Sequence, residues 1–438
     1  MASRWYFHQL SGQSPVIHDL VVIGGGAAGF YAAAILREQS PAARILILER
    51  GKEVLTKVKV SGGGRCNVTH AAFEVPELSA NYPRGQRELV GPFYHYGPSQ
   101  TLEFFERRGV QLKTEEDGRI FPVSDQSQTI IDCLVSASSG ALTKVLKGHS
   151  VQQFVWNEEE ELWTVQTKEV VFTSRYVLVA TGSNPKIWDL LSQMNLKLVD
   201  PVPSLFTFRI KDALLEGLAG ISQEVSLSVV LRQRAAVEIP KRFPKVLEAS
   251  GPLLITHKGV SGPAVLRLSA WGALPLHLLN YQFQFQVNWL PQWGSNDLQK
   301  EIEKRKSEQP KKQLHGTPLG GLTKRLWQRL CTVAEIVPEH RWVDLNSKQV
   351  DRLIEQLHAT TFQVNGKNTF KEEFVTAGGV DLKEIDFKRF ESKKWPGLYF
   401  AGEVLNIDAI TGGFNFQNAW TGAYLAALSI AEKLDVDA

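Results

Sequence analysis

The sequence predicts an α/β protein in which a parallel-sheet domain is interrupted by an antiparallel β insert that carries a nested helical subdomain. Continuous apolar strands are predicted at 19–23, 44–48, 176–180 and 397–403. Such strands are typical of parallel sheets that are buried on both faces. Between the third and fourth of them the pattern changes, with short alternating strands at 204–288 followed by polar helices.

The first elements form a βαβ unit. Strand 19–23 is followed by Gly24-x-Gly26-x-x-Gly29, by a helix over 27–39 that stops at Ser40-Pro41, and by a strand that ends in Glu49. In this context Gly24 permits the tight turn, Gly26 lets the main chain approach a diphosphate, and Gly29 lets the helix pack closely on the strand. Glu49 is placed to accept hydrogen bonds from ribose hydroxyls. The pattern predicts a Rossmann-like dinucleotide-binding domain.

Two later segments favour FAD over NAD as the dinucleotide. Thr181-Gly182 ends a strand about 150 residues after the first turn, and Gly402-Glu403 ends the last strand. Thr411-Gly412-Gly413-Phe414 then precedes the final helix, so its N–H groups are expected to face the flavin ring and stabilise negative charge on it. A tight turn without a ligand is the alternative for these glycines.

Two further glycine-rich segments carry candidate residues. Ser61-Gly62-Gly63-Gly64-Arg65-Cys66-Asn67 lies in a predicted loop over 52–70, where the glycines would let a flat ligand or a phosphate approach the main chain. Arg65 could contact a phosphate or an anionic substrate, and Cys66 is interpreted as a structural thiol. Thr256 to Pro263 is expected to form a lid over the flavin, so that His257 meets the substrate; a structural histidine is the alternative.

Composition limits the function classes. The formal net charge is only +3, and the basic run 304–312 is interleaved with glutamates, which indicates a solvated helix face rather than a nucleic-acid surface. The three cysteines are widely spaced, so neither a disulfide framework nor a metal site is expected. Met1 to His18 lack the apolar core of a signal peptide, and no apolar run reaches the ~20 residues of a membrane span. We therefore expect a cytoplasmic protein with no membrane or nucleic-acid partner.

The predicted domains follow from these changes of pattern. An FAD-binding domain comprises residues 15–200 and 372–438, a β insert comprises 201–288 and 358–371, and a helical insert comprises 289–357. No second GxGxxG follows residue 150, so any NAD(P)H would bind transiently across the flavin. The sequence indicates no oligomeric state.

The motifs together resemble the BaiN/YhiN-type FAD-dependent flavoproteins, also labelled NAD(P)/FAD-dependent oxidoreductases or aminoacetone oxidases. The resemblance covers about residues 18–435 and rests on the 24–29 and 61–67 motifs together with Glu116 to Pro122, Thr256 to Pro263, Thr376 to Val380 and Gly402 to Leu405. It implies bound FAD, a domain of the glutathione-reductase-2 type with an antiparallel β-barrel-like insert, and cofactor contacts at Gly24, Gly26, Gly29, Glu49, Arg65, Gly402 and Gly413. Asn406 stands where the family usually has Asp, which leaves the substrate open.

We expect an FAD-dependent oxidoreductase that transfers electrons, as hydride, between a reductant such as NAD(P)H and a small organic substrate. The alternatives are an amine-type oxidase that uses oxygen, a flavin-containing binding or sensor protein, and an NAD-only dehydrogenase. No catalytic residue is assigned beyond the candidates Arg65 and His257. The predicted cofactor-binding residues are Gly24, Gly26, Ala27, Ala28, Gly29, Glu49, Arg50, Lys57, Ser61, Gly63, Gly64, Arg65, Cys66, Asn67, Thr181, Gly182, Gly402, Glu403, Asp408, Gly412, Gly413, Phe414 and Asn415.

Overall fold

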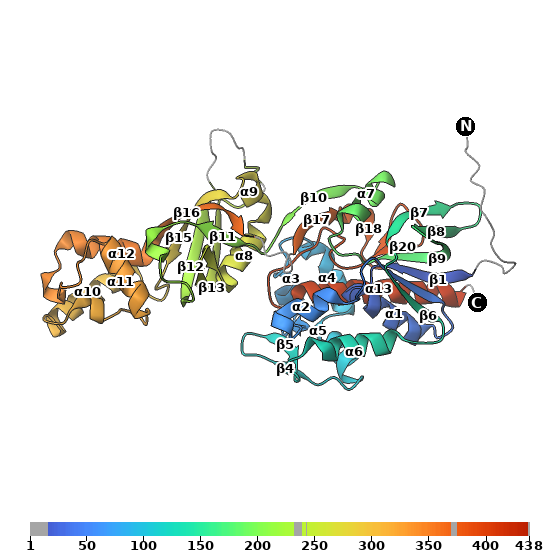
Figure 1. Ribbon diagram of the computed structural model, residues 1–438, viewed down its shortest axis with the longest axis horizontal. Coiled ribbons are helices and arrows are strands. Elements are labelled where there is room, and N and C mark those ends of the chain that lie inside the picture. The colour runs from blue at the N-terminus through green and yellow to red at the C-terminus, as the bar shows by residue number, and fades with distance from the viewer. Residues whose placement is uncertain (1–15, 232–238, 242, 369–374, 437–438) are drawn as a thin grey trace.

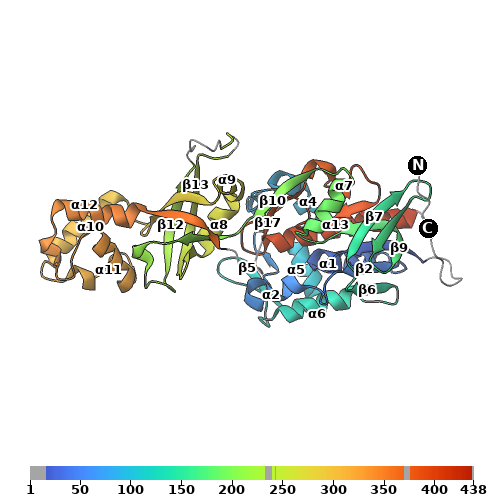
Figure 2. The same cartoon turned by 45° about the horizontal axis from the view of Figure 1, so that its top comes forward.

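The computed structural model describes residues 16–231, 239–241, 243–368 and 375–436. The molecule is elongated, with an α/β domain at one end, a β-barrel in the middle and a group of helices at the other end (Figure 1). The turned view shows the same three parts in a row (Figure 2). The first and last segments of the chain lie together in the α/β domain, which is the arrangement that the sequence predicts.

The α/β domain is organised around parallel strands. The neighbours in the central part of the sheet run in the order β20 (Leu398–Phe400), β9 (Val171–Val179), β1 (Ile17–Ile23), β2 (Ile45–Glu49) and β6 (Thr143–Lys147), and every pair is parallel. The apolar side chains of β20, β2 and most of β1 are buried because helices cover the sheet, whereas Ile17, Val145 and Val171 are exposed. Antiparallel strands extend the sheet: β7 (Val151–Asn157), β8 (Leu162–Thr167), β18 (Ile385–Asp386) and β19 (Glu391–Ser392).

Two long helices bring the ends of the chain together. Helix α1 (Ala27–Gln39) is rich in alanine, and its small buried side chains let it pack closely beside α13 (Phe414–Val436), as Figure 1 also shows. The other helices of the domain are α2 (Thr56–Gly64), α3 (Val75–Ser79), α4 (Gln86–His95), α5 (Pro98–Glu106), α6 (Ser127–Ser138) and α7 (Pro185–Gln193). A small antiparallel sheet of β3 (Thr69–His70), β5 (Arg119–Pro122) and β4 (Leu112–Thr114) lies beside α13.

The insert begins after β10 (Leu198–Pro203), which pairs with β17 (Thr376–Val380). Six antiparallel strands close a barrel: β11 (Thr207–Ile210), β12 (Ser222–Val230), β13 (Val246–Thr256), β14 (Gly259–Ser261), β15 (Gln282–Asn288) and β16 (Thr360–Asn368). Alternate residues of these strands point inward, and Phe208 packs against both Phe283 and Phe285 in the barrel core. Helices α8 (Pro263–Trp271) and α9 (Ala273–Leu278) pack on this barrel and on the linker to the α/β domain.

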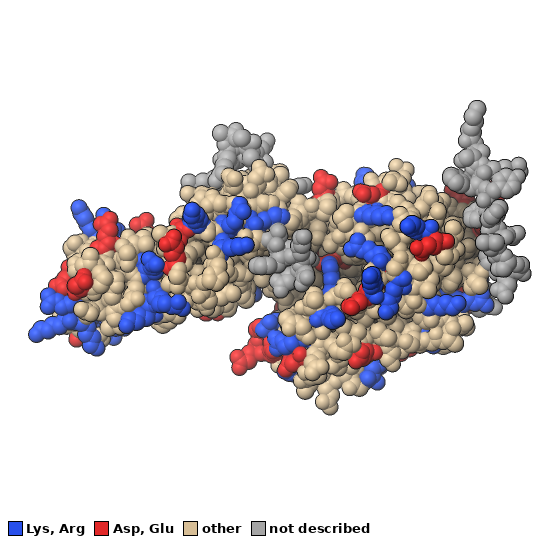
Figure 3. Space-filling model, viewed as in Figure 1, with Lys and Arg blue, Asp and Glu red and all other residues tan. Residues whose placement is uncertain are grey.

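The helical insert joins β15 to β16 and contains α10 (Ser295–Glu308), α11 (Lys324–Val333) and α12 (Ser347–Ala359). Charged side chains of both signs lie on the face in view (Figure 3). On α10, Arg305 lies 2.8 Å from Glu301, and Lys306 lies 3.8 Å from Glu303. These pairs one helical turn apart support the interpretation of a solvated face.

The predicted fold class is confirmed, with local differences. Helix α1 has the predicted bounds, whereas the predicted loop 52–70 contains α2. Within α2 the main chain leaves helical dihedral angles at Ser61, which is extended. Gly62 and Gly63 after it adopt left-handed conformations. Most of the predicted N-terminal extension, residues 1–15, lies outside the described residues. No helix in the described part of the chain has the length and apolarity needed to cross a bilayer.

Candidate functional site

The turn between β1 and α1 is constrained by close main-chain contacts. Gly24 has φ +115°, and a Cβ placed on it would collide with the carbonyl oxygen of Ala180 at the end of β9. A Cβ on Gly29 would collide with the carbonyl oxygen of Gly24. Gly26, the residue before α1, has no side-chain cap, and its Cβ position meets nothing closer than 4.0 Å. Because no side chain caps it, the first turn of α1 leaves its N–H groups available to an anionic ligand.

Glu49 is held in a fixed orientation at the end of β2. Its Oε2 accepts a hydrogen bond from the N–H of Gly25 at 2.8 Å, and its Oε1 accepts one from Gly51 at 2.6 Å. Each carboxylate oxygen keeps a second lone pair for a ligand hydroxyl. An open pocket adjoins this carboxylate; its lining includes Arg50 and Thr181 from the predicted set, and His149, Ser150, Val151, Asn184, Lys186 and Ile187, which the sequence did not identify.

The early and late glycine segments meet. A Cβ on Gly402 would lie 3.7 Å from the Cβ atoms of both Ala28 on α1 and Ala419 on α13. A Cβ on Gly182 would lie 3.4 Å from Glu403 Oε2 and 3.7 Å from Lys57 Nζ. Lys57 and Glu403 form an ion pair with each other. The structure therefore brings the 24–29 turn, Lys57, Gly182 and the 402–403 segment to one place.

The second glycine pair lies against strand β3. A Cβ on Gly413, which has φ +92°, would lie 2.5 Å from the carbonyl oxygen of Thr69 and 2.8 Å from Asn67 Oδ1. Asn67 is 8% exposed, and its Oδ1 is buried without a hydrogen-bond partner among the described residues. Gly63 and Gly64, in the same glycine-rich segment as Asn67, have open space where side chains would be. Open glycines beside an unsatisfied buried acceptor fit a flat ligand that donates hydrogen bonds, as the flavin of FAD does.

Two residues near this end were missed by sequence reasoning. The ring of His70 stacks on the ring of Phe414 with centroids 4.6 Å apart, and its Nδ1 is buried without a partner in the described structure. Asn418 in the first turns of α13 also has a buried, unpartnered Oδ1. His70 follows directly after the 61–67 motif, which was a usable signal, whereas nothing in the sequence distinguishes Asn418 from its helical neighbours.

Several predicted residues have structural contacts of their own. Cys66 is fully buried in the hydrophobic core, and burial raises the pKa of its thiol to about 12, which agrees with the interpretation of a structural thiol. The Ser61 hydroxyl donates to the carbonyl of Val58 at 2.9 Å. The Asn415 amide exchanges two hydrogen bonds with the main chain of Ala409, at 3.0 and 3.1 Å.

Arg65 has partners different from those expected. Its guanidinium lies 2.6 Å from Glu115 and 3.5 Å from Asp125, and it stacks over the ring of Phe121 at 4.0 Å from the centroid. The hydrogen bond to Glu115 raises the pKa of Arg65 further. These partners belong to the β4–β5 hairpin and its flanks, so the structure ties the glycine loop to that hairpin through Arg65.

Asp408 is buried and bound by other side chains, and its predicted contact with the cofactor stays a prediction. Its side chain is 0% exposed and forms a bidentate ion pair with Arg84. Ser204 also donates to it, at 2.6 Å. Burial raises the pKa of Asp408, and the charge of Arg84 opposes that rise. The carboxylate is occupied by Arg84 of the α/β domain and by Ser204 of the linker to the barrel.

His257 is also not where the lid hypothesis placed it. It lies, exposed, in the turn between β13 and β14. The carbonyl oxygen of the neighbouring Lys258 accepts a hydrogen bond from the N–H of Ile210. Ile210 is the last residue of β11, at the opposite end of that strand from the linker at Ser204. This end of the barrel adjoins the helical insert, since Arg325 and Arg329 of α11 donate to Gly217 and Glu216 beside it. The barrel therefore separates His257 from the glycine turns.

Comparison with known proteins identifies the family. The family model described as "HI0933-like protein Rossmann domain" matches residues 18–429. The chain belongs to this family. As the sequence resemblance implied, it is a family of FAD-binding oxidoreductases, and FAD is its cofactor.

The relatives carry different names. A "Ribosomal RNA dihydrouridine synthase" of Haemophilus influenzae is 28% identical over 94% of this chain and 98% of its own length. A "3-dehydro-bile acid delta(4,6)-reductase" of Clostridium scindens is 26% identical over 94% of this chain and 98% of its own length. Among solved structures, a 3-ketosteroid-delta4-(5alpha)-dehydrogenase from Rhodococcus jostii RHA1 is 14% identical, covers 94% of this chain and 96% of its own, and has a TM-score of 0.49.

Proposed function

We propose that this chain binds FAD with its adenosine in the Glu49 pocket, its diphosphate at the 24–29 turn and its flavin beside Gly412 and Gly413. The observation that carries the proposal is the convergence of the early and late glycine segments around one site, with Gly402 between α1 and α13. In this arrangement Glu49 accepts hydrogen bonds from ribose hydroxyls, and the N–H groups at the start of α1 bind the diphosphate.

FAD supplies two-electron transfer, usually as hydride. The protein residues orient and tune it. Asn67 offers an acceptor to a flavin or ribityl donor, and Glu403 offers one to a ribityl hydroxyl. The first N–H groups of α13, which follow Gly413 directly, favour negative charge on the ring beside them. Lys57, held by Glu403, provides positive charge at the point where the early and late segments meet.

We further propose that the reaction is a reduction, with NAD(P)H as the electron donor and a carbon–carbon double bond conjugated to a carbonyl as the acceptor; bound FAD would carry the electrons between them. The names of both relatives denote saturation of such a bond, in uridine and in a 3-dehydro-bile acid. The substrate is proposed to be a small molecule. The proposed compartment is the cytoplasm, which agrees with Cys66, Cys133 and Cys331 all being free thiols.

The test begins with the visible spectrum of the purified protein, which should show the two flavin bands at a stoichiometry of about one per chain. Anaerobic titration with NADH and with NADPH should bleach these bands, and a conjugated enone should restore them. A colourless protein that does not take up added FAD would overturn the cofactor assignment. A ribosomal RNA that carries uridine at the site of modification belongs in the same assay, because turnover of that RNA alone would replace the small-molecule substrate.

The remaining alternatives give different results in this experiment. An oxidase would resist reduction by both nicotinamides, would be reduced by an amine, and would reoxidise rapidly in oxygen. A flavin-containing binding or sensor protein would be yellow and would turn over none of these compounds. The stopped-flow rates of flavin reduction by NADH, by NADPH and by an amine therefore separate the three functions without knowledge of the natural substrate.

A further inference from the structure

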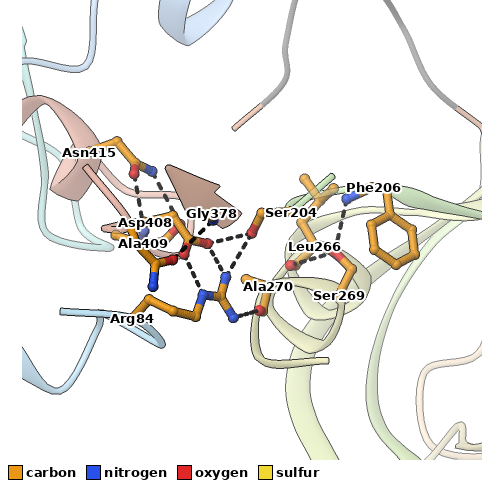
Figure 4. Close-up of polar contacts among 11 residues, drawn as sticks. Arg84, Ser204, Phe206, Leu266, Ser269, Ala270, Gly378, Asp408, Ala409 and Asn415 are labelled. Carbon is orange, nitrogen blue, oxygen red and sulfur yellow. Dashed lines mark hydrogen bonds and ion pairs between the residues drawn. The ribbon is translucent and has the colours of Figure 1, made fainter. Parts of the chain in front are cut away.

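A buried ion pair lies where the barrel meets the α/β domain (Figure 4). Arg84, in the segment between α3 and α4, directs both ends of its guanidinium to the carboxylate of Asp408. Its side chain is 11% exposed and that of Asp408 is 0% exposed. The main chains of the two residues also form an isolated antiparallel bridge. Both residues belong to the α/β domain, so the pair first fixes the loop 404–410 onto the segment that precedes α4.

The same guanidinium reaches the insert. Its Nη1 donates to the carbonyl oxygen of Ala270, near the end of α8, at 2.7 Å. Its Nη2 lies 3.3 Å from the hydroxyl of Ser204, in the linker that leads into the barrel. Ser204 in turn donates to Asp408 at 2.6 Å. One side chain therefore holds the α/β domain, the outgoing linker and a helix of the insert together.

A second link fixes the linker to the barrel. The N–H of Phe206 donates to the hydroxyl of Ser269 at 2.9 Å, and that hydroxyl donates to the carbonyl of Leu266 within α8. The chain leaves the α/β domain through this linker and returns to it at β17. Two chain crossings alone allow rotation, and relative motion is the usual behaviour of domains whose interface is small. The side-chain contacts of Arg84 oppose that motion.

The pair also connects to the proposed flavin segment. Asp408 lies between Glu403 and Gly412, and the next residue, Ala409, exchanges two hydrogen bonds with Asn415 at the start of α13. Polar contacts, together with the peptide bond between Asp408 and Ala409, thus connect Ala270 in the insert through Arg84 to Asn415, as Figure 4 shows. A change in the angle between the barrel and the α/β domain would therefore displace the loop 404–410, which connects the two late glycine segments.

We propose that Arg84 is a positioning residue that sets the angle of the barrel relative to the α/β domain, so that the barrel and the 402–415 segment move as one body. Any substrate that enters between them would then meet a site of fixed width. The proposal goes beyond the proposed reaction and holds whichever substrate is reduced.

The test measures the distance between the domains in the full chain loaded with FAD. Cys133, the half-buried thiol, is replaced by serine, while Cys66 and Cys331 are buried. Spin labels are then attached at Val90→Cys on α4 and Gln284→Cys on β15, both exposed positions. The variant Arg84→Gln/Asp408→Asn removes both charges together, which avoids leaving one buried charge without its partner. The matched control is Arg107→Gln, which breaks the pair with Glu38 inside the α/β domain.

We expect a narrow distance distribution for the parent and for Arg107→Gln, and a distribution at least about twofold wider for the double variant, since released domains rotate about their linkers. A role confined to stability would lower the melting temperature and leave the distribution narrow, and that result would overturn the proposal. If the double variant does not fold, Arg84→Lys decides. It keeps a cation beside Asp408 but loses the planar fork that also reaches Ala270, so an unchanged width in this variant would equally overturn the proposal.

Discussion

Lys57 and Glu403 form an ion pair beside Gly182, although 346 residues separate them in the chain. Lys57 is 56% exposed and Glu403 is 16% exposed, so the pair contributes little to the stability of the fold. Its position matters more, because it joins the early and late segments of the proposed FAD site. The two side chains are therefore expected to act in cofactor binding.

Lys57→Met should reduce FAD affinity about tenfold, equivalent to about 1.4 kcal/mol, and change the free energy of unfolding of the FAD-free protein by less than about 1 kcal/mol. The reason is loss of a positive charge near an anionic cofactor rather than loss of packing. Equilibrium dialysis with FAD measures the first quantity and urea unfolding the second. Lys59→Met, which removes the exposed lysine paired with Glu53, is the control and should leave both unchanged. Equal FAD affinities for the two variants would contradict the assignment.

Gly29→Ala should abolish FAD binding and destabilise the protein by about 2–3 kcal/mol, because the new methyl group would collide with the carbonyl oxygen of Gly24. Gly91→Ala provides the opposite case. Gly91 lies within α4, and nothing beyond its chain neighbours lies within 4 Å of its Cβ position; because Pro92 follows it directly and offsets the usual gain from alanine in a helix, the free energy of unfolding should change by less than about 1 kcal/mol. Flavin absorbance after gel filtration and thermal unfolding measure both effects. Retention of flavin by Gly29→Ala would show that this turn does not bind the diphosphate.

Cys66 should remain unreactive until the pH approaches 12. Burial raises the pKa of its thiol to about 12, whereas the unfolded chain loses that proton near pH 9. Above pH 9 the unfolded state therefore binds fewer protons than the folded state, so this group lowers stability by about 1.4 kcal/mol per pH unit up to pH 12. Cys66→Ala should show a shallower loss of stability between pH 9 and 10.5 than the parent. At pH 8, alkylation of the native protein should modify the half-buried Cys133 before Cys66; the reverse order would contradict the buried position.

The sequence alone was enough to predict features that depend only on residues close to one another in the chain. The bounds of α1 and the 24–29 turn follow from a local pattern of apolar residues and glycines, and the structure reproduces them. The contacts of Asp408 could not be predicted in this way, because its partners Arg84 and Ser204 lie 324 and 204 residues away. The position of His257 depended on which end of a closed barrel faces the α/β domain, and strand periodicity does not contain that information.

His70 should make both stability and flavin retention sensitive to acid. Its ring stacks on Phe414, and a Cβ on Gly118 would collide with it, so the half-buried ring is closely packed on these two sides. Its Nε2 lies 3.1 Å from the carbonyl of Asp117, which makes Nε2–H the donor and leaves Nδ1 buried without a partner in the described structure. Burial lowers the pKa of His70, and the Asp117 carbonyl opposes that effect. The folded protein therefore keeps this ring neutral at pH 7.

Below about pH 6.5 the unfolded chain binds a proton at this position before the folded chain does, so the stability that His70 contributes is lost as the pH falls from 6.5 toward its lower folded value. The free energy of unfolding of the parent should therefore drop more steeply between pH 7 and 5 than that of His70→Gln. Flavin release should follow the same course, because β3 lies against Gly413 through Thr69. His95→Gln, at an exposed histidine at the end of α4, should behave like the parent. Parallel pH profiles for the parent and His70→Gln would show that this ring is not the acid-sensitive group.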